Sequence, residues 1–346
     1  MEPAVGAWCT GRSLCFRLRD HERRLSAVRL IGPAFAAADF AYSDAERVWE
    51  LRLPRPPAWR YEYRLELHHR DGGVQTGCDP DNPHRVPGGY GDSSVLTCPG
   101  YREPDWLRLP AAPGDWRDVY LPLPALHAEM VARIWSPSAP THRVVVAHDG
   151  PDYQRYAELG RYTAALIGAG RVPPYHLVLL PPGERFEWYS ASPAYARALA
   201  GDVLPKLAAE LGTAAPVVGV GASLGGLALL HAQRRHPAGF AGLFLQSGSF
   251  FQPRFDRQES GFRRYLRIVR FTGRVARDPG GPAVPVALTC GSIEENLANN
   301  RDLAQTLRAQ GYPVDFTEVP DAHNWVAWRD ALDPHLTGLL RRVWPD

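Results

Sequence analysis

The sequence predicts an α/β protein in which a small all-β domain precedes a larger, mostly parallel sheet with helices on both faces. Two observations lead to this fold class. Short runs of alternating apolar and polar residues, separated by proline and glycine clusters, fill the chain to about residue 112. Beyond about residue 115, near-continuous valine and leucine runs alternate with helical patterns, which is typical of a parallel sheet buried on both faces.

The first part of the chain is expected to form an immunoglobulin-like sandwich. Its clearest alternating runs lie at 27–31, 48–53 and 61–67. Alternation with a period of two is typical of strands that bury one face. The turn-rich stretch 110–114 is expected to link this domain, residues 1–112, to a second domain at 113–346.

The second domain is expected to alternate strands with helices after two strand-like segments at 118–123 and 129–135. Its further strands are expected at 143–147, 175–180, 216–220, 241–245, 285–289 and 314–319. Its helices are expected at 153–168, 193–211, 224–235, 297–310 and 324–343. In such a sheet, ligands and catalytic groups gather at the carboxyl ends of the strands.

Composition narrows the classes of function. The 346 residues carry a formal net charge of only +2, whereas a dedicated nucleic-acid binder has a strong basic excess. We therefore expect no nucleic-acid partner. No apolar run approaches the roughly 18 residues of a membrane span, so no membrane association is expected, and the first residues lack the pattern of a signal peptide.

The cysteines indicate the redox environment in which the protein is expected to work. They are Cys9, Cys15, Cys78, Cys98 and Cys290. Their odd number and loose spacing match neither a disulfide framework nor a zinc site. Reduced thiols and a cytoplasmic location are expected, with no metal and no cofactor.

The sharpest chemical signal is the run Gly221-Ala222-Ser223-Leu224-Gly225. It directly follows the buried strand expected at 216–220 and opens a helix, which is the context of the nucleophile elbow of α/β-hydrolases. A serine hydroxyl is a weak nucleophile that must stand out on a tight turn, where the glycines leave room. The pattern therefore predicts an α/β-hydrolase core with Ser223 as its nucleophile.

A dinucleotide fingerprint is the alternative for this glycine-rich turn. Leu224 stands where the third glycine or alanine of that fingerprint belongs, and no Asp or Glu occurs between Ser223 and Asp256. The fingerprint needs both features, one for helix packing and one for the ribose. The sequence therefore argues against a dinucleotide site.

The acid and the base of an α/β-hydrolase follow the nucleophile along the chain in that order. His323 follows the last expected strand, and we expect it to act as the base. Glu294 and Glu295 both follow the strand before it. The spacing from Gly291 favours Glu294 as the acid, whereas Glu295 suits the first turn of the next helix. Among the other histidines, His148 is the main rival base.

The oxyanion hole of this fold uses two backbone N–H groups. The first belongs to the residue after the nucleophile, here Leu224. The second belongs to the loop after the third hydrolase strand, here 148–153. Pro151 has no N–H, which leaves Gly150 and Asp152 as the candidates.

Together these motifs resemble the enterochelin esterases, also called ferric enterobactin esterases. The resemblance covers most of the chain and rests on 79–83, 87–91, 148–150, 221–226, 246–249 and 323–329. It implies hydrolysis of a carboxylic ester or lactone in the cytoplasm, with Ser223 as nucleophile and His323 as base. The best-known members hydrolyse the trilactone of a catecholate siderophore. One stretch departs from the family pattern: the usual Gly-Gly-His-Asp reads Asp321-Ala322-His323-Asn324 here.

Two groups of charged residues are candidates for substrate binding. Arginines and aromatic residues between Phe251 and Asp278 suit an anionic aromatic ligand, and an amphipathic helix with a solvated basic face explains the same pattern. Arg185 and Glu187 form the second group, for which surface ion pairing is an equal explanation.

The leading prediction is a serine esterase that acts on a small-molecule ester through an acyl-enzyme. An acyltransferase on the same core, and a non-catalytic carbohydrate- or ligand-binding protein, are the alternatives. The sequence does not decide between a monomer and a homo-oligomer. Fold alone does not decide among these functions either.

Overall fold

The computed structural model describes residues 5–89 and 91–345. Tyr90, which belongs to the family-like segment 87–91, therefore lies outside the described residues. Contacts divide the chain into two units. The first unit extends to Arg102 and includes two later segments, Gly291–Glu294 and Val319–Ala327; the second unit contains the rest. The predicted boundary at 112 and the immunoglobulin-like character of the first unit stay predictions.

Two antiparallel sheets build the first unit, so the predicted all-β character is confirmed. One sheet has the order β1-β2-β6-β5. Its strands are β1 (Gly6–Cys9), β2 (Ser13–Arg19), β5 (Ala41–Ser43) and β6 (Val48–Pro54). The other has the order β4-β3-β7-β10-β9, with β8 paired to β7. Its strands are β3 (Leu25–Gly32), β4 (Phe35–Asp39), β7 (Arg60–His69), β8 (Val74–Gly77), β9 (Arg85–Val86) and β10 (Ser93–Thr97).

The core of the first unit follows the strand period. Alternate residues of β2 and β7 are buried, among them Phe16 and Tyr63, whose ring centroids are 5.0 Å apart. The structure corrects the expectation of reduced thiols at one place, because Cys9 and Cys98 form a disulfide. Cys9 ends β1 and Cys98 directly follows β10, so the pairing depends on strand ends that sequence spacing does not reveal.

The second unit contains an eight-stranded sheet with the order β11-β12-β14-β13-β15-β16-β17-β18. Its strands are β11 (Gly114–Leu123), β12 (Ala128–Pro137), β13 (Val144–Ala147), β14 (His176–Leu179), β15 (Val217–Ala222), β16 (Phe240–Gln246), β17 (Val286–Gly291) and β18 (Val314–Val319). The pairs from β14 to β17 are parallel, and β11 and β12 add an antiparallel hairpin. The predicted mostly parallel sheet is confirmed.

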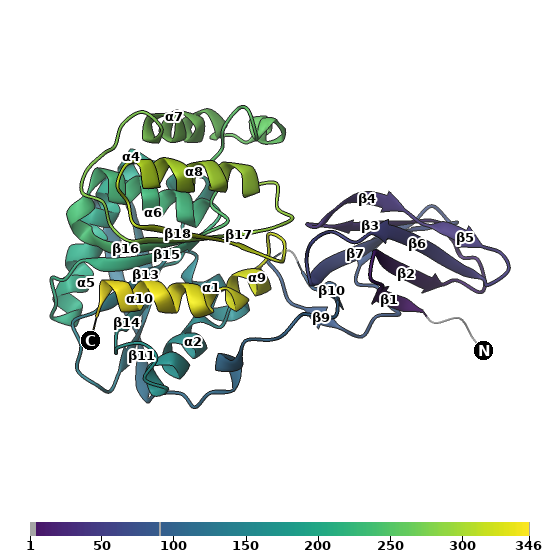
Figure 1. The fold of residues 1–346 in the computed structure, drawn as a ribbon, viewed down its shortest axis with the longest axis horizontal. Helices are drawn as coiled ribbons and strands as arrows, with labels where there is room; N and C mark the ends of the chain where they lie inside the picture. The colour runs from purple at the N-terminus through teal and green to yellow at the C-terminus, as the bar shows by residue number, and fades with distance from the viewer. Residues whose placement is uncertain (1–4, 90, 346) are drawn as a thin grey trace. The chain divides into compact units, whose positions relative to one another are not determined.

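Helices cover both faces of this sheet. They are α1 (Gly150–Tyr156), α2 (Leu159–Gly168), α3 (Arg185–Trp188), α4 (Pro193–Ala198), α5 (Leu204–Leu211), α6 (Leu224–Arg235), α7 (Tyr265–Val275), α8 (Leu297–Ala309), α9 (Trp325–Asp330) and α10 (Thr337–Val343). Figure 1 shows α6 and α8 on one face and α2 and α10 on the other. Within the described part of the chain, no helix is long and apolar enough to cross a membrane.

Candidate active site

Ser223 lies on a strained turn between β15 and α6. Its backbone has φ 54° and ψ −123°, a conformation that side chains other than glycine rarely adopt. The turn is tight because the strand and the helix almost touch. A Cβ at Gly221 would lie 2.6 Å from the backbone carbonyl carbon of Gly225, so no side chain fits at Gly221, and a Cβ at Gly225 would lie 3.2 Å from Oδ2 of Asp149. The structure therefore contains the predicted elbow.

The hydroxyl of Ser223 has a partner from the neighbouring strand. Its Oγ lies 3.1 Å from the Oγ of Ser249, and the Ser249 N–H donates to the Ser223 carbonyl at 3.2 Å. Ser249 is buried and follows β16. It belongs to the family-like segment 246–249, for which the sequence offered no role.

His323 is joined to an acid, and that acid is Glu294. Nδ1 of His323 lies 2.8 Å from Oε2 of Glu294, whose other oxygen accepts the Gly291 N–H at 2.8 Å. The Glu294 side chain is 1% exposed and that of His323 is 34% exposed. Glu295 points into solvent. Of the two acids left open by the sequence, only Glu294 is positioned to orient this imidazole.

The predicted oxyanion donors differ in their hydrogen bonds. Among the described residues, the Leu224 N–H has no hydrogen-bond partner. The N–H of Gly150 already donates to Leu180 at 2.8 Å, and that of Asp152 donates to Asp149 at 3.0 Å. The geometry therefore gives no support to Gly150 or Asp152 as the second donor.

Asp149, which the sequence did not single out, has the most weakly bonded N–H group of this loop. Its N–H makes only a long bond, 3.4 Å, to the Tyr189 hydroxyl, and its φ is 50°. The signal was Pro151, because proline marks the first turn of a helix. Because the helix starts at Gly150, the N–H of Asp152 points toward the Asp149 carbonyl. Of the N–H groups of Asp149, Gly150 and Asp152, that of Asp149 is the one with only a long hydrogen bond.

Arg185 and Glu187 form ion pairs with different residues. Arg185 makes two bonds to the Asp149 carboxylate, Nε to Oδ1 at 2.8 Å and Nη2 to Oδ2 at 2.9 Å. Asp149 is almost fully buried, and Arg185 is 30% exposed. Glu187 instead pairs with Arg264 and Arg267. Arg185 therefore fixes the loop at Asp149, whereas Glu187 ties α3 to the segment around α7.

His148 does not have the environment of a catalytic base. Its Nδ1–H donates to the Gly225 carbonyl at 3.1 Å, and its Nε2 accepts from the Tyr195 hydroxyl at 2.9 Å. Complete burial lowers its pKa to about 4. Both nitrogens are therefore used to hold the elbow against its neighbours, and the rival to His323 has a structural role.

Sequence comparison gives the family. Residues 118–339 match the family described as "Putative esterase". The chain belongs to this esterase family. The uncharacterized protein YjcH of Bacillus subtilis (strain 168) is 26% identical over 235 residues, which cover 62% of this chain and 93% of YjcH.

Solved structures show the same fold for nearly the whole of this esterase-family chain. The enterobactin esterase FES from Shigella flexneri, solved in the presence of enterobactin, matches with a TM-score of 0.78 at 19% identity. The match covers 97% of this chain and 95% of that one. Ferric enterobactin esterase from Salmonella typhimurium matches with a TM-score of 0.78 at 20% identity, over 95% and 93% of the two chains. The predicted resemblance to enterochelin esterases is therefore confirmed in family and in fold.

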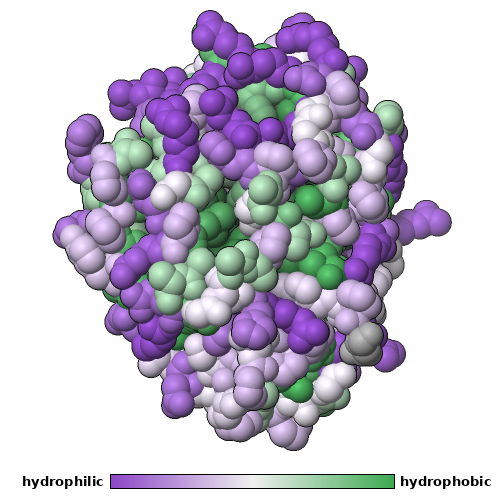
Figure 2. Space-filling view, turned by 90° about the vertical axis from the view of Figure 1, so that its left-hand side faces the viewer, coloured by the Kyte–Doolittle hydropathy of each residue, from purple (hydrophilic) through white to green (hydrophobic). Residues whose placement is uncertain are grey.

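The later part of the arginine-rich segment of this esterase-family chain, Tyr265–Val275, forms the amphipathic helix α7. One face is buried through Tyr265, Ile268, Phe271, Thr272 and Val275. The other face is open to solvent, and Leu266 on it is 64% exposed. Figure 2 shows hydrophilic side chains gathered at the top of the view, the level at which Figure 1 draws α7.

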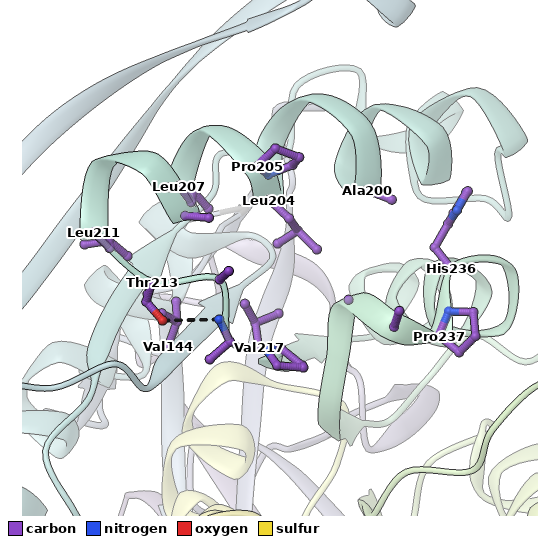
Figure 3. Close-up of a pocket in the computed structure, with 16 residues that line it drawn as sticks. Val144, Ala200, Leu204, Pro205, Leu207, Leu211, Thr213, Val217, His236 and Pro237 are labelled. Atoms are coloured by element: carbon purple, nitrogen blue, oxygen red, sulfur yellow. Dashed lines mark hydrogen bonds between the residues drawn. The ribbon is translucent and has the colours of Figure 1, made fainter.

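An apolar groove of about 470 Å³ lies elsewhere in the second unit. Figure 3 shows it between α5 and the starts of the strands, with Val144 and Val217 on its floor and His236 at one end. Val144 and Val217 begin β13 and β15, whereas Ser223 follows the end of β15. The groove therefore lies at the opposite edge of the sheet from the elbow and is separate from it.

Proposed function

We propose that the protein is a serine esterase that hydrolyses a carboxylic ester or lactone through Ser223, His323 and Glu294. The observation that carries this proposal is the hydrogen-bonded pair of His323 and Glu294, together with a serine on a strained elbow. The three residues follow β15, β17 and β18 in the chain order that α/β-hydrolases use.

The direction of the strands supports the same assignment. β15 and β16 are parallel, and so are β16 and β17. The Val286 N–H donates to the Pro313 carbonyl, and the Ser292 N–H donates to the Val319 carbonyl. Since the residue number rises on both strands from the first bond to the second, β17 and β18 run in the same direction. Catalytic groups of open α/β sheets gather at the carboxyl ends of such strands.

The chemistry follows from this assignment. The Glu294 carboxylate accepts the Nδ1–H of His323, so Nε2 carries the lone pair. His323 takes the proton of Ser223 as Oγ attacks the ester carbonyl. The same proton then goes to the leaving alcohol oxygen as the acyl-enzyme forms. A water molecule, deprotonated by His323, attacks the acyl-enzyme and releases the acid and Ser223.

The oxyanion of each tetrahedral intermediate is assigned to two backbone donors, Leu224 N–H and Asp149 N–H. The first lacks a partner among the described residues, and the second has only the long bond to Tyr189. Arg185 supports this assignment because its two bonds hold the Asp149 side chain. One such donor is typically worth about 10²–10³ in rate.

The substrate class rests on the relatives. The structures of FES were solved with enterobactin and with 2,3-dihydroxy-N-benzoyl-serine. We extend this class, a catecholate ester or lactone, to the present chain. A cytoplasmic location stays a prediction, and the Cys9–Cys98 disulfide argues against it. Arg270 and Arg274, which are exposed on α7, suit an anionic aromatic ligand, whereas Arg264 and Arg267 are paired with Glu187. No observation favours the acyltransferase or the carbohydrate-binding alternative.

The test is turnover of short-chain p-nitrophenyl esters by the wild type and by Ser223→Ala, with fluorophosphonate labelling and peptide mapping. We expect one label, at Ser223, and turnover reduced by at least about 10³-fold in the variant. Ser26→Ala, an exposed serine on β3, is the matched control. Folded wild type that neither labels nor turns over any ester, catecholate lactones included, would contradict the proposal.

A further inference from the structure

A buried arginine holds the segment that carries His323. Arg60 begins β7, and its side chain is 3% exposed. Its Nη1 donates to Oδ1 of Asn324 at 3.1 Å and to Oδ2 of Asp321 at 3.4 Å, and its Nη2 bonds to Glu62. These four residues, called the Arg60 cluster below, all belong to the first unit.

The cluster fixes the chain on both sides of His323. Oδ1 of Asp321 accepts the Ala322 N–H at 2.7 Å and the Asn324 amide at 2.8 Å. Oδ1 of Asn324 also accepts the Ala327 N–H at 2.9 Å, which satisfies a donor in the first turn of α9. Arg60 thus bonds to two side chains that in turn hold the backbone before and after the imidazole.

The chain next to Arg60 also holds both segments of the acid–base pair. The Trp59 N–H donates to the Pro320 carbonyl at 3.0 Å, on the His323 side. The Ser292 hydroxyl donates to the Pro57 carbonyl at 2.6 Å, on the Glu294 side. The loop 55–59, between β6 and β7, therefore bonds to the segments of both partners of the pair.

The charge of the buried Arg60 side chain accounts for its acidic partners. A buried guanidinium is costly unless carboxylates compensate it and hydrogen bonds use its protons. Burial raises the pKa of the Asp321 carboxyl to about 6, against the opposing effect of the Arg60 charge. Near neutral pH the cluster therefore holds one arginine charge against two carboxylates, Glu62 at Nη2 and Asp321 at Nη1, and Asp321 is the one on the segment of His323.

We propose that Arg60 is a positioning residue for the base His323, and that it requires one carboxylate on the segment, at either position 321 or position 324. The proposal rests on the function proposed above. Nη1 bonds to both positions, so either can hold the charge while the other supplies an amide. In this chain the acid stands at Asp321, two residues before His323, and the amide stands at Asn324, directly after it.

The test exchanges the two side chains. Asp321→Asn removes the carboxylate, and Asp321→Asn with Asn324→Asp restores it on the other side of His323. A displacement of about 1 Å can cost about 10²-fold in rate. We expect kcat to fall at least about 10-fold in the single variant with KM nearly unchanged, and to recover to within about 3-fold in the double variant.

Three measurements are made on each full-length variant. They are kcat and KM for the p-nitrophenyl ester, the rate of fluorophosphonate labelling, and hydrogen exchange of the peptide 319–327 by mass spectrometry. Asp315→Asn is the matched control, since Asp315 is exposed on β18 and pairs with Arg342. Should the double variant fail to fold, Arg60→Lys keeps the charge but not the fork, and we expect the same fall in kcat with KM unchanged.

The outcomes separate the two proposals. Recovery of both kcat and exchange protection in the double variant supports the positioning role. A single variant equal to the wild type in both, or a folded double variant as slow as the single one, overturns it while the esterase function stands. If the wild type shows no turnover and no label, the esterase proposal fails, and exchange alone decides the role of Arg60 in holding the segment.

Discussion

The elbow of Ser223 and the segment of His323 are held in place by different physics. At the elbow, the backbone sets the geometry. Gly221 and Gly225 let strand and helix approach, and Ser223 takes a strained φ of 54° in consequence. At the base, buried side-chain charges set the geometry. Arg60 lies on β7 and bonds to Asp321 and Asn324, which flank His323 on its own segment.

This difference predicts how each part responds to change. Steric placement does not depend on pH and is lost only when a new atom must fit into a closed space. Placement by buried charges depends on protonation, and removal of one partner leaves the other uncompensated. The nucleophile should therefore tolerate the loss of neighbouring side chains, whereas the base should not.

The largest effect is expected at the acid that orients the base. Glu294→Gln places an amide donor opposite Nδ1 and favours the tautomer that protonates Nε2, which then cannot accept the Ser223 proton. We expect kcat to fall roughly 10³–10⁴-fold, as for comparable acids in catalytic triads. Ester turnover and the rate of fluorophosphonate labelling measure this.

Glu295→Gln is the matched control for this prediction, because Glu295 is exposed and adjacent in sequence. We expect turnover within about twofold of the wild type, as for a surface substitution away from the site. Equal losses in the two variants would show that the pair with His323 has no role in orienting the base.

The elbow and the segment of His323 also differ in how far the sequence predicts them. The elbow is local, because strand, glycines, serine and helix are consecutive, and the sequence predicted it in full. The order of Ser223, Glu294 and His323 could also be predicted, since each follows a recognisable strand. The spacing from Gly291 favoured Glu294 over Glu295 but left both open, and the structure places Glu294 against His323.

Arg60 could not be predicted, because it lies on a strand far from His323 in the sequence and no spacing rule connects the two. The Cys9–Cys98 disulfide was missed for the same reason. The sequence also did not predict which N–H of the loop 148–153 stays weakly bonded, because a motif identifies the loop but not which of its N–H groups the following helix uses. The residues missed are those whose role depends on bonds between distant segments or on backbone direction.

A smaller effect is expected on stability at Asp321. Burial raises its pKa from the ordinary 3.8 to about 6, so the folded state binds this proton more tightly than the unfolded state. Between these values folding takes up a proton, and stability from this group falls as pH rises. The shift of about two units corresponds to roughly 3 kcal/mol.

Urea unfolding of the wild type and Asp321→Asn between pH 4 and pH 8 measures this linkage. We expect the free energy of unfolding of the wild type, relative to the variant, to be greater at pH 4 than at pH 8 by up to about 3 kcal/mol. A difference that does not change with pH, or that changes in the opposite direction, would mean that Asp321 is not a strained buried acid.

The smallest effect is expected at the hydroxyl partner of the nucleophile. Ser249→Ala removes the Oγ that lies 3.1 Å from Ser223 Oγ. The backbone bond from Ser249 N–H to the Ser223 carbonyl remains, and so does the strained turn. Because the backbone positions Ser223, we expect kcat/KM to change by no more than about threefold, which is the scale of one neutral hydrogen bond at the lower end of its range.

The effect of Ser249→Ala shows whether backbone packing alone positions Ser223. The labelling rate of Ser249→Ala is compared with that of Asp321→Asn under the same conditions, because the first tests the side-chain partner of the nucleophile and the second tests the support of the base. A loss in Ser249→Ala as large as that in Asp321→Asn would mean that side chains position the nucleophile too, and the contrast between the two regions would disappear.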